Sequence, residues 1–217
     1  MRPIDRFLDR RDAGRRLAQR LTLYAGRDDV VVLALPRGGV PVAFEVAQAL
    51  DAPLEVFLVR KLGVPGHPEL AMGAIASGGV RIVNAEVVDE LAIGPDVIDR
   101  VAAEEATELE RREDLYRRGR PLPPLEHRTV ILVDDGLATG ATMEAAIAAV
   151  RRLRAARIVA AVPVGARESC GRVAAAADDV VCAETPAFFS AVGQWYERFD
   201  QTTDDEVVDL LAAANRG

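Results

Sequence analysis

Short, continuous runs of apolar residues recur along this chain, and most are followed by a turn and then by an amphipathic segment. The runs have the length of strands that are buried on both faces, and they lie at residues 30–35, 54–59, 129–133, 157–164 and 179–183. Helical spacing of apolar residues is found at residues 5–25, 40–50, 85–92, 96–118, 140–154, 168–177 and 203–214. This alternation predicts an α/β fold, with an open, mostly parallel sheet that carries helices on both faces.

The segment between the second and third apolar runs has a different pattern. Residues 60–70 contain two prolines and two glycines, which predicts a mobile loop. Residues 71–83 predict a hairpin that turns at Ser77-Gly78-Gly79. The helix at 96–118 is rich in Glu and Arg and has a narrow apolar stripe, which is typical of a solvated face. A lid or partner-binding helix is the alternative.

The most informative stretch is VILVDDGLATGAT, at residues 130–142. A buried strand leads into Asp134 and Asp135, and a turn of small and hydroxylated residues then leads into a helix. The N–H groups at a helix N-terminus favour phosphate. Adjacent carboxylates repel phosphate and instead suit vicinal ribose hydroxyls or a hydrated metal ion. The pattern therefore indicates a sugar phosphate, and its glycine spacing excludes a Walker loop.

Two other turns also follow predicted strands. One is Pro36-Arg37-Gly38-Gly39, and the other begins with Arg60 and Lys61, which is the single lysine of the chain. Ligands of open parallel sheets bind beyond the carboxyl ends of the strands, so we expect all three turns to face one crevice. An ordinary solvated strand end is the alternative interpretation of Arg60 and Lys61.

Charge and cysteine content exclude several classes of protein. The net charge of −7 disfavours binding to nucleic acid, and no apolar run has the length of a membrane span. The N-terminal segment is charged and lacks the apolar centre of a signal peptide. Cys170 and Cys182 form no metal-binding pattern, and we expect two buried thiols in a cytoplasmic protein.

The stretch at 130–142 resembles the phosphoribosyl-pyrophosphate (PRPP) signature of the type I phosphoribosyltransferases, with its acidic pair and T-G-x-T loop. The wider chain is similar to a bacterial branch of that family whose acceptor base is not assigned. The resemblance implies that Asp134 and Asp135 bind the ribose hydroxyls and reach Mg²⁺ directly or through water. It also implies that the 5-phosphate is bound by the residues of the loop, Ala138, Thr139, Gly140, Ala141 and Thr142.

The other turns acquire roles from the same resemblance. Arg37, Gly38 and Gly39 match the pyrophosphate loop, in which the Pro36–Arg37 peptide bond is expected to be cis. Arg60 and Lys61 match the start of the flexible catalytic loop. The implied reaction displaces pyrophosphate from PRPP by a nitrogen of a purine or pyrimidine-like base, with Mg²⁺ bound to PRPP. The residues expected to take part in the chemistry are Asp134, Asp135, Lys61 and Arg37.

One position departs from the pattern of the enzymes that use 6-oxopurines. Those enzymes have an aspartate general base before the T-G pair, whereas this chain has Ala138. Proton removal then falls to another group, for which Glu69 is a candidate, or is not needed. Trp195 or Tyr196 could stack on the base. Alternatively, these aromatic residues could pack the tail, residues 185–217, onto the sheet.

The resemblance also implies an organisation for the whole chain. We expect a single phosphoribosyltransferase domain over residues 1–217, with a core at about 26–60 and 128–184 and a hood at about 61–120 and 185–200. We expect a homodimer. A regulatory protein that binds PRPP without catalysis is the main alternative. A receiver-type signalling domain would also place an acidic pair at a strand end, but it needs a lysine after a later strand, and Lys61 comes too early.

Overall fold

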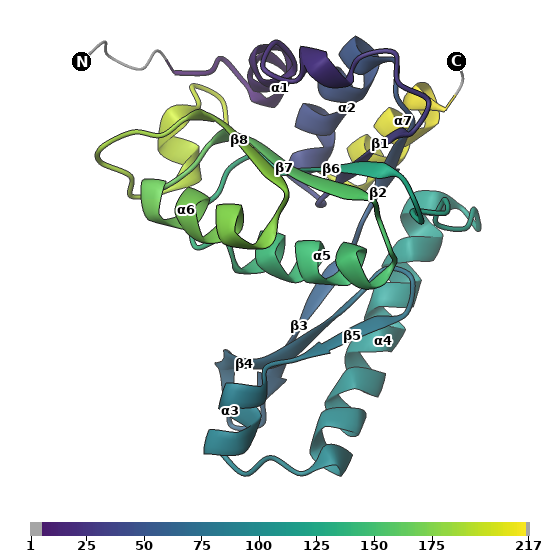
Figure 1. Ribbon diagram of the computed structural model, residues 1–217, viewed down its shortest axis with the longest axis vertical. Coiled ribbons are helices and arrows are strands. Elements are labelled where there is room, and N and C mark those ends of the chain that lie inside the picture. The colour runs from purple at the N-terminus through teal and green to yellow at the C-terminus, as the bar shows by residue number, and fades with distance from the viewer. Residues whose placement is uncertain (1–5, 216–217) are drawn as a thin grey trace.

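A five-stranded parallel sheet forms the centre of the computed structural model, which describes residues 6–215 (Figure 1). The strand order is β2-β1-β6-β7-β8. The bounds are β1 (Val30–Ala34), β2 (Leu54–Val56), β6 (Thr129–Val133), β7 (Arg157–Val164) and β8 (Asp179–Glu184). Every residue of β1 and β6 is buried, as expected for strands covered on both sides. The predicted α/β fold with an open parallel sheet is confirmed.

Helices cover both faces of this sheet (Figure 1). One face packs against α1 (Arg10–Ala18), α2 (Gly39–Leu50) and α7 (Asp204–Ala214), and the other against α5 (Ala141–Arg152) and α6 (Arg167–Ala176). Successive strand residues point to opposite faces, so Val30 and Val32 join the first layer while Val31 and Leu33 join the second. The apolar runs of the sequence are continuous because both faces of the strands are buried.

An antiparallel lobe extends from the parallel sheet and lies below that sheet in Figure 1. It contains β3 (Val59–Val64), β4 (His67–Ala76), β5 (Val80–Val83), α3 (Ala85–Glu90) and α4 (Pro95–Arg117). The predicted hairpin at 71–83 is confirmed, and its turn contains Gly78 and Gly79, both with positive φ. Glycine adopts this conformation without the steric cost that other residues incur.

The mobile loop predicted at 60–70 is wrong, because most of this segment belongs to a second hairpin, β3–β4. Lys61 pairs with Ala74 and Leu62 with Gly73, and the turn at Pro65-Gly66 uses a φ of +83° at Gly66. The proline and glycine content marked this tight turn and a bulge beside Gly63. Pairing with β4 keeps the rest of the segment extended.

Two further boundaries differ from the sequence prediction. The apolar run at 54–59 divides after Val56, where the chain leaves the parallel sheet to enter the antiparallel lobe. The N-terminal helix is shorter than predicted: α1 is capped by the side chain of Asp9, and a separate 3₁₀ turn, η1 (Thr22–Tyr24), follows it. Residue 5 of the predicted helix lies outside the described residues.

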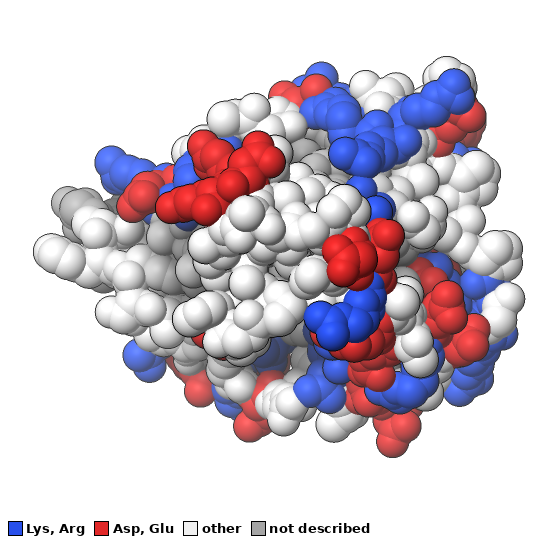
Figure 2. Space-filling model, turned by 90° about the horizontal axis from the view of Figure 1, so that it is seen from below, with Lys and Arg blue, Asp and Glu red and all other residues white. Residues whose placement is uncertain are grey.

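The long helix α4 packs its narrow apolar stripe against the antiparallel sheet. Ile98, Ala102 and Leu109 are buried in one cluster with Leu62 and Met72 of the sheet. The other sides of α4 remain charged and solvated, as predicted. Figure 2 views the molecule from the end that carries this lobe and shows acidic and basic side chains next to one another on that face.

Cys170 of α6 and Cys182 of β8 form a disulfide, so the prediction of two free thiols is wrong. Helix α6 packs beside β8 and brings the two Cα atoms to 6.9 Å apart. The sequence alone gave no sign of this proximity, because the two cysteines lie on different elements of the fold.

None of the helices within residues 6–215 is long and apolar enough to cross a membrane.

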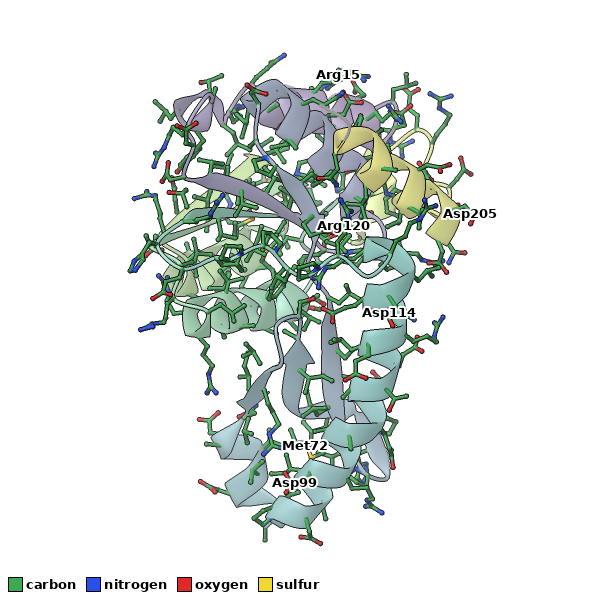
Figure 3. The ribbon with its side chains drawn as sticks, turned by 90° about the vertical axis from the view of Figure 1, so that its right-hand side faces the viewer. Arg15, Met72, Asp99, Asp114, Arg120 and Asp205 are labelled. Atoms are coloured by element: carbon green, nitrogen blue, oxygen red, sulfur yellow. A yellow bond between two sulfur atoms is a disulfide. The ribbon has the colours of Figure 1, made fainter. Side chains whose placement is uncertain are left out.

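A buried arginine joins the antiparallel lobe to the parallel sheet. Arg117, at the end of α4, donates hydrogen bonds to the carbonyl of Val56 and to Ser77 Oγ, and its Nη1 lies 2.9 Å from Glu113 Oε1. Its Nε lies 3.8 Å from the buried carboxylate of Glu55. Arg120, labelled in Figure 3, approaches the same carboxylate at 3.6 Å. Burial raises the pKa of Glu55, and the two guanidinium groups oppose that rise.

We predict that Arg117→Met lowers the free energy of unfolding at neutral pH by about 3 kcal/mol, because it leaves the buried Glu55 carboxylate without its buried charge partner. The raised pKa of Glu55 means that the folded state binds its proton more tightly than the unfolded state does. Removing the charge of Arg117 takes away one of the interactions that lower this pKa, so the loss should grow as pH rises through and above the ordinary carboxyl range. Urea unfolding at several pH values measures this.

The matched control is Arg112→Met on the same helix, where the arginine pairs with Glu108 at 2.6 Å on a solvated face. Its effect should stay below about 0.5 kcal/mol. Equal losses for the two variants, or a loss at Arg117 that does not change with pH, would contradict the role of the buried pair.

Candidate active site

Two of the three predicted turns meet at the carboxyl ends of β1 and β6. Gly38 and Gly39 pack directly against Asp134 and Asp135. A Cβ added to Gly39 would lie 2.7 Å from the carbonyl oxygen of Val133 and 2.9 Å from Asp134 Cα, and one added to Gly38 would overlap the Asp135 carboxylate. Only glycine allows this close approach, so the glycines serve the packing of the two turns as well as access to a ligand.

One oxygen of each carboxylate in the acidic pair accepts a hydrogen bond from another group of the protein. Asp134 Oδ1 accepts the backbone N–H of Asp135 at 2.8 Å, and Asp135 Oδ2 accepts Arg10 Nε at 2.8 Å. The residues that the structure describes give no hydrogen bond to Asp134 Oδ2 or Asp135 Oδ1. The pair therefore retains one acceptor oxygen on each carboxylate, which matches the two hydroxyl donors of a vicinal diol.

The acidic pair is electrostatically costly. Burial raises the pKa of Asp134 well above its usual range, and the neighbouring charge of Asp135 adds to the rise. Burial also raises the pKa of Asp135, against the opposing charge and hydrogen bond of Arg10. Two close carboxylates with one guanidinium leave negative charge uncompensated, which favours hydroxyl donors or a further cation at this position.

The loop that follows the acidic pair is held by α6 and by the chain that follows β7. Leu137 is buried, and its backbone pairs with the chain that follows β7. Ser169 of α6 donates a hydrogen bond to the carbonyl of Ala138, and Arg172 donates one to the carbonyl of Thr139. Gly140 caps α5 with a φ of +84°, a conformation that favours glycine.

Because α6 binds the carbonyls of Ala138 and Thr139, the opposite side of the loop faces solvent. Ala138, Thr139, Ala141 and Thr142 are exposed, and no side chain within residues 6–215 caps the N-terminus of α5. The first N–H groups of a helix have no partner within the helix, and the helix dipole makes this end positive. The arrangement is compatible with a phosphate group at this position, which stays a prediction.

The third predicted turn, now the hairpin β3–β4, approaches the same loop from the antiparallel lobe. Lys61 and Arg60 line a cleft of about 970 Å³ together with Ala141 and Thr142. Lys61 Nζ lies 3.5 Å from Glu69 Oε2, and the Lys61 side chain is about half exposed. Arg60 Nε donates to Glu105 of α4 at 2.7 Å. The lysine can therefore reorient, whereas Arg60 is held by α4.

Arg37 occupies the turn between β1 and α2, and the Pro36–Arg37 peptide bond is cis, as the resemblance implied. Its Nη1 lies 3.7 Å from Asp204 Oδ1, at the start of α7. Tyr116 also donates a hydrogen bond to Asp204, at 2.6 Å. The backbone of this turn is at the acidic pair, while the Arg37 side chain points toward α7.

The tail after β8 contains Tyr196 and Phe199 and packs against the backbone of the acidic pair. Tyr196 is 3% exposed, and its ring lies 5.4 Å from that of Phe7 and 4.9 Å from that of Phe199. Its hydroxyl donates to the carbonyl of Asp135 at 2.5 Å. Tyr196 therefore packs the tail, one of the two roles that the sequence allowed. Trp195 is half-buried, and its buried Nε1 has no hydrogen-bond partner among the described residues.

Three residues that the sequence did not single out support the site: Arg10, Ser169 and Arg172. Arg10 is one of seven arginines among the first 20 residues, and nothing in its local sequence distinguishes it. Ser169 and Arg172 are spaced by three on α6 and so share a face, but no motif links them to the loop at 138–142. Only the packing of α6 behind the loop identifies them.

The acidic pair fits a metal ion that arrives with its substrate. Residues 6–215 contain no group of three or more His, Cys, Asp or Glu side chains placed to hold a metal. Mg²⁺ is commonly bound through one or two carboxylates together with substrate phosphates and water. Asp134 and Asp135, each with one available oxygen, meet that requirement.

Comparison with known proteins identifies the family. A model of the phosphoribosyl transferase domain matches residues 69–198. Two Mycobacterium tuberculosis proteins, named "Putative phosphoribosyl transferase MT0597" (strain CDC 1551 / Oshkosh) and "Putative phosphoribosyl transferase Rv0571c" (strain ATCC 25618 / H37Rv), are each 54% identical over 210 residues. The chain belongs to the phosphoribosyl transferase family.

The similarity covers 97% of this chain but 47% of each mycobacterial protein, so the chain spans about half the length of the curated relatives it matches. Among solved structures, TT1426 from Thermus thermophilus is 44% identical and superposes with a TM-score of 0.86. That match covers 96% of this chain and 98% of the other. The fold is thus shared over nearly the whole chain, including the segment before residue 69.

We predict that Gly39→Ala lowers the free energy of unfolding by about 1–3 kcal/mol, because the new methyl group meets backbone atoms of Val133 and Asp134 that cannot move aside easily. Chemical denaturation measures the loss. Gly171→Ala in α6 is the matched control, since its Cβ meets nothing within 4 Å, and it should stabilise the protein by about 0.5–1 kcal/mol. A stabilised Gly39 variant would contradict the close packing of the two turns.

Proposed function

We propose that this chain transfers the phosphoribosyl group of PRPP to a nitrogenous base and releases pyrophosphate. The observation that carries the proposal is the meeting of Gly38 and Gly39 with Asp134 and Asp135 at the carboxyl ends of two adjacent strands, with the loop at 138–142 immediately after the acidic pair. This arrangement offers separate places for the pyrophosphate, diol and 5-phosphate of PRPP. The parallel sheet would be the core of one domain, and the antiparallel lobe and tail would form its hood.

Each part of the ligand would meet a different kind of group. The N–H groups of residues 138–142 would hold the 5-phosphate at the N-terminus of α5. The available oxygens of Asp134 and Asp135 would accept hydrogen bonds from the two ribose hydroxyls. The backbone of Arg37, Gly38 and Gly39 would hold the pyrophosphate. Fixing the sugar at three points leaves its C1 atom oriented toward an incoming nitrogen.

The chemical step breaks the bond between C1 and the pyrophosphate oxygen and forms a bond between C1 and the base nitrogen. Negative charge grows on the departing pyrophosphate, so cations near it lower the barrier. Lys61, which lies half exposed in the cleft beside Ala141 and Thr142, would supply one such charge after leaving Glu69, and Arg37 would supply another after leaving Asp204. Mg²⁺, bound with PRPP, would add charge neutralisation.

Proton removal from the base does not have an obvious partner in the loop. Ala138 stands where a general base would be, and its carbonyl is used by Ser169. Glu69 belongs to the same hairpin as Lys61 and lines the same cleft. We propose Glu69 as the proton acceptor when the acceptor base requires one, and Trp195 as the aromatic residue that stacks on the base.

The decisive experiment mixes the protein, Mg²⁺ and PRPP with a panel of purines and pyrimidines and follows the release of pyrophosphate. We expect release with at least one base. Binding of PRPP without turnover for any base would instead favour a regulatory protein. Failure to bind PRPP at all would reject both functions.

We predict that the double substitution of Asp134→Asn and Asp135→Asn abolishes measurable PRPP binding, because an amide at each position replaces a charged acceptor of the ribose hydroxyls and of the metal ion. Isothermal titration calorimetry with PRPP and Mg²⁺ measures the loss, and circular dichroism checks the fold. Asp205→Asn, an exposed position on α7 labelled in Figure 3, is the control. Unchanged affinity in the double variant would rule out the assigned role of the pair.

We predict that Lys61→Met lowers kcat about 100-fold and changes the KM for PRPP much less, because the lysine acts on charge that develops only as pyrophosphate departs. Steady-state kinetics with the base found in the panel separate the two constants. Arg81→Met is the control, since Arg81 lies on β5 of the same sheet and pairs with Asp99 on the surface. A loss confined to KM would show that Lys61 contributes only to binding.

A further inference from the structure

Arg10 connects the N-terminal helix to the acidic pair, although 125 positions separate it from Asp135 in sequence. It lies outside the region matched by the family model, which begins at residue 69. Its side chain is only 12% exposed, and that of Asp135 is 15% exposed. An ion pair this sheltered differs from the many exposed pairs elsewhere on the chain, whose contribution is small.

The contacts of Arg10 fix the position of its guanidinium group. Nη1 donates a hydrogen bond to the carbonyl of Asp200 at 2.6 Å, and the guanidinium carbon lies 3.9 Å from the centre of the Phe199 ring. Nε is thereby directed at Asp135 Oδ2. The planar guanidinium makes these contacts at once, which a lysine ammonium cannot reproduce. The tail and the N-terminal helix thus hold the arginine in one place.

The same contacts limit the orientation of the Asp135 carboxylate. Oδ2 lies between Arg10 and the backbone of Gly38, with no room for even a methyl group on that glycine. The backbone of Asp135 is held as well, because Tyr196 donates a hydrogen bond to its carbonyl. Rotation of the carboxylate would break the Arg10 contact, so Oδ1 is the oxygen left to face a ligand.

We propose that Arg10 is a positioning residue for ribose recognition: it holds Asp135 Oδ2 so that Oδ1 is presented to one hydroxyl of the sugar. The inference rests on the proposed function and names the residue that gives the diol site its selectivity. Arg10 does not contact the sugar itself in this arrangement. Its effect on binding passes through the carboxylate that it orients.

The test compares ribose 5-phosphate with its 2-deoxy and 3-deoxy analogues by calorimetry in the presence of Mg²⁺. The parent protein should bind ribose 5-phosphate more tightly than each analogue. Arg10→Met keeps the aliphatic stem of the side chain and removes its charge and donors. It should reduce the preference over at least one analogue by about 10-fold, because a poorly oriented carboxylate gains less from that hydroxyl.

A loss of structure alone would weaken all three ligands in parallel and leave the preferences unchanged. Arg15→Met is the matched control, since Arg15, labelled at the top of Figure 3, lies on the same helix and pairs only with Glu45, at 3.5 Å, among the described residues. It should retain the preferences of the parent.

A double-mutant cycle with Asp135→Asn shows whether Arg10 acts through the carboxylate. In the Asp135→Asn background, Arg10→Met should change the preferences little further. Unchanged preferences in Arg10→Met, or fully additive effects of the two substitutions, would overturn the assignment of Arg10 while leaving the proposed function intact. A parent protein that binds neither PRPP nor ribose 5-phosphate would overturn the proposed function itself.

Discussion

The parallel pairing of β1 with β6 is the constraint on which the site depends. Ala34 lies opposite Val133, so the two strands end level with each other and their turns emerge side by side. Gly38 and Gly39 then pack against Asp134 and Asp135 without intervening side chains. A shift of one residue in this register would separate the turns and turn the strand side chains to the opposite faces of the sheet. The buried apolar positions on both faces of these strands oppose such a shift.

Around this pair of turns, hydrogen bonds within the protein set the orientation of the loop carbonyls and of the two carboxylates. The carbonyls of Ala138 and Thr139 are bound by α6, and this leaves the other side of the loop exposed at the N-terminus of α5. One oxygen of each carboxylate is bound by the protein, and this leaves the second oxygen available. The protein therefore prepares its acceptor and donor groups before a ligand arrives, which reduces the reorganisation that binding would otherwise require.

The antiparallel lobe supplies the remaining groups and is joined to the sheet through a buried polar junction. Arg117 binds the end of β2, the hairpin turn at Ser77 and the charge of Glu113, so it fixes the angle at which the lobe leaves the sheet. That angle places Lys61 in the same cleft as Ala141 and Thr142. The position of Lys61 relative to the loop at 138–142 thus depends on an ion-pair network in a different part of the molecule.

Local sequence determined the elements with strong periodicity. The apolar runs predicted the strands of the parallel sheet, because side-chain burial acts over a few residues. The stretch at 130–142 correctly predicted a strand, a turn and a helix, and its sugar-phosphate site stays a proposal. Tertiary structure decided what depends on distant partners. It extended the segment at 60–70 by pairing it with β4, joined Cys170 to Cys182, turned Arg37 toward Asp204 and brought Arg10 to Asp135. The last three contacts link different layers of the fold or elements that are far apart along the chain, and no local pattern encodes which pairs will meet. The pairing of β3 with β4 is local along the chain, but the proline and glycine content of the segment did not reveal it.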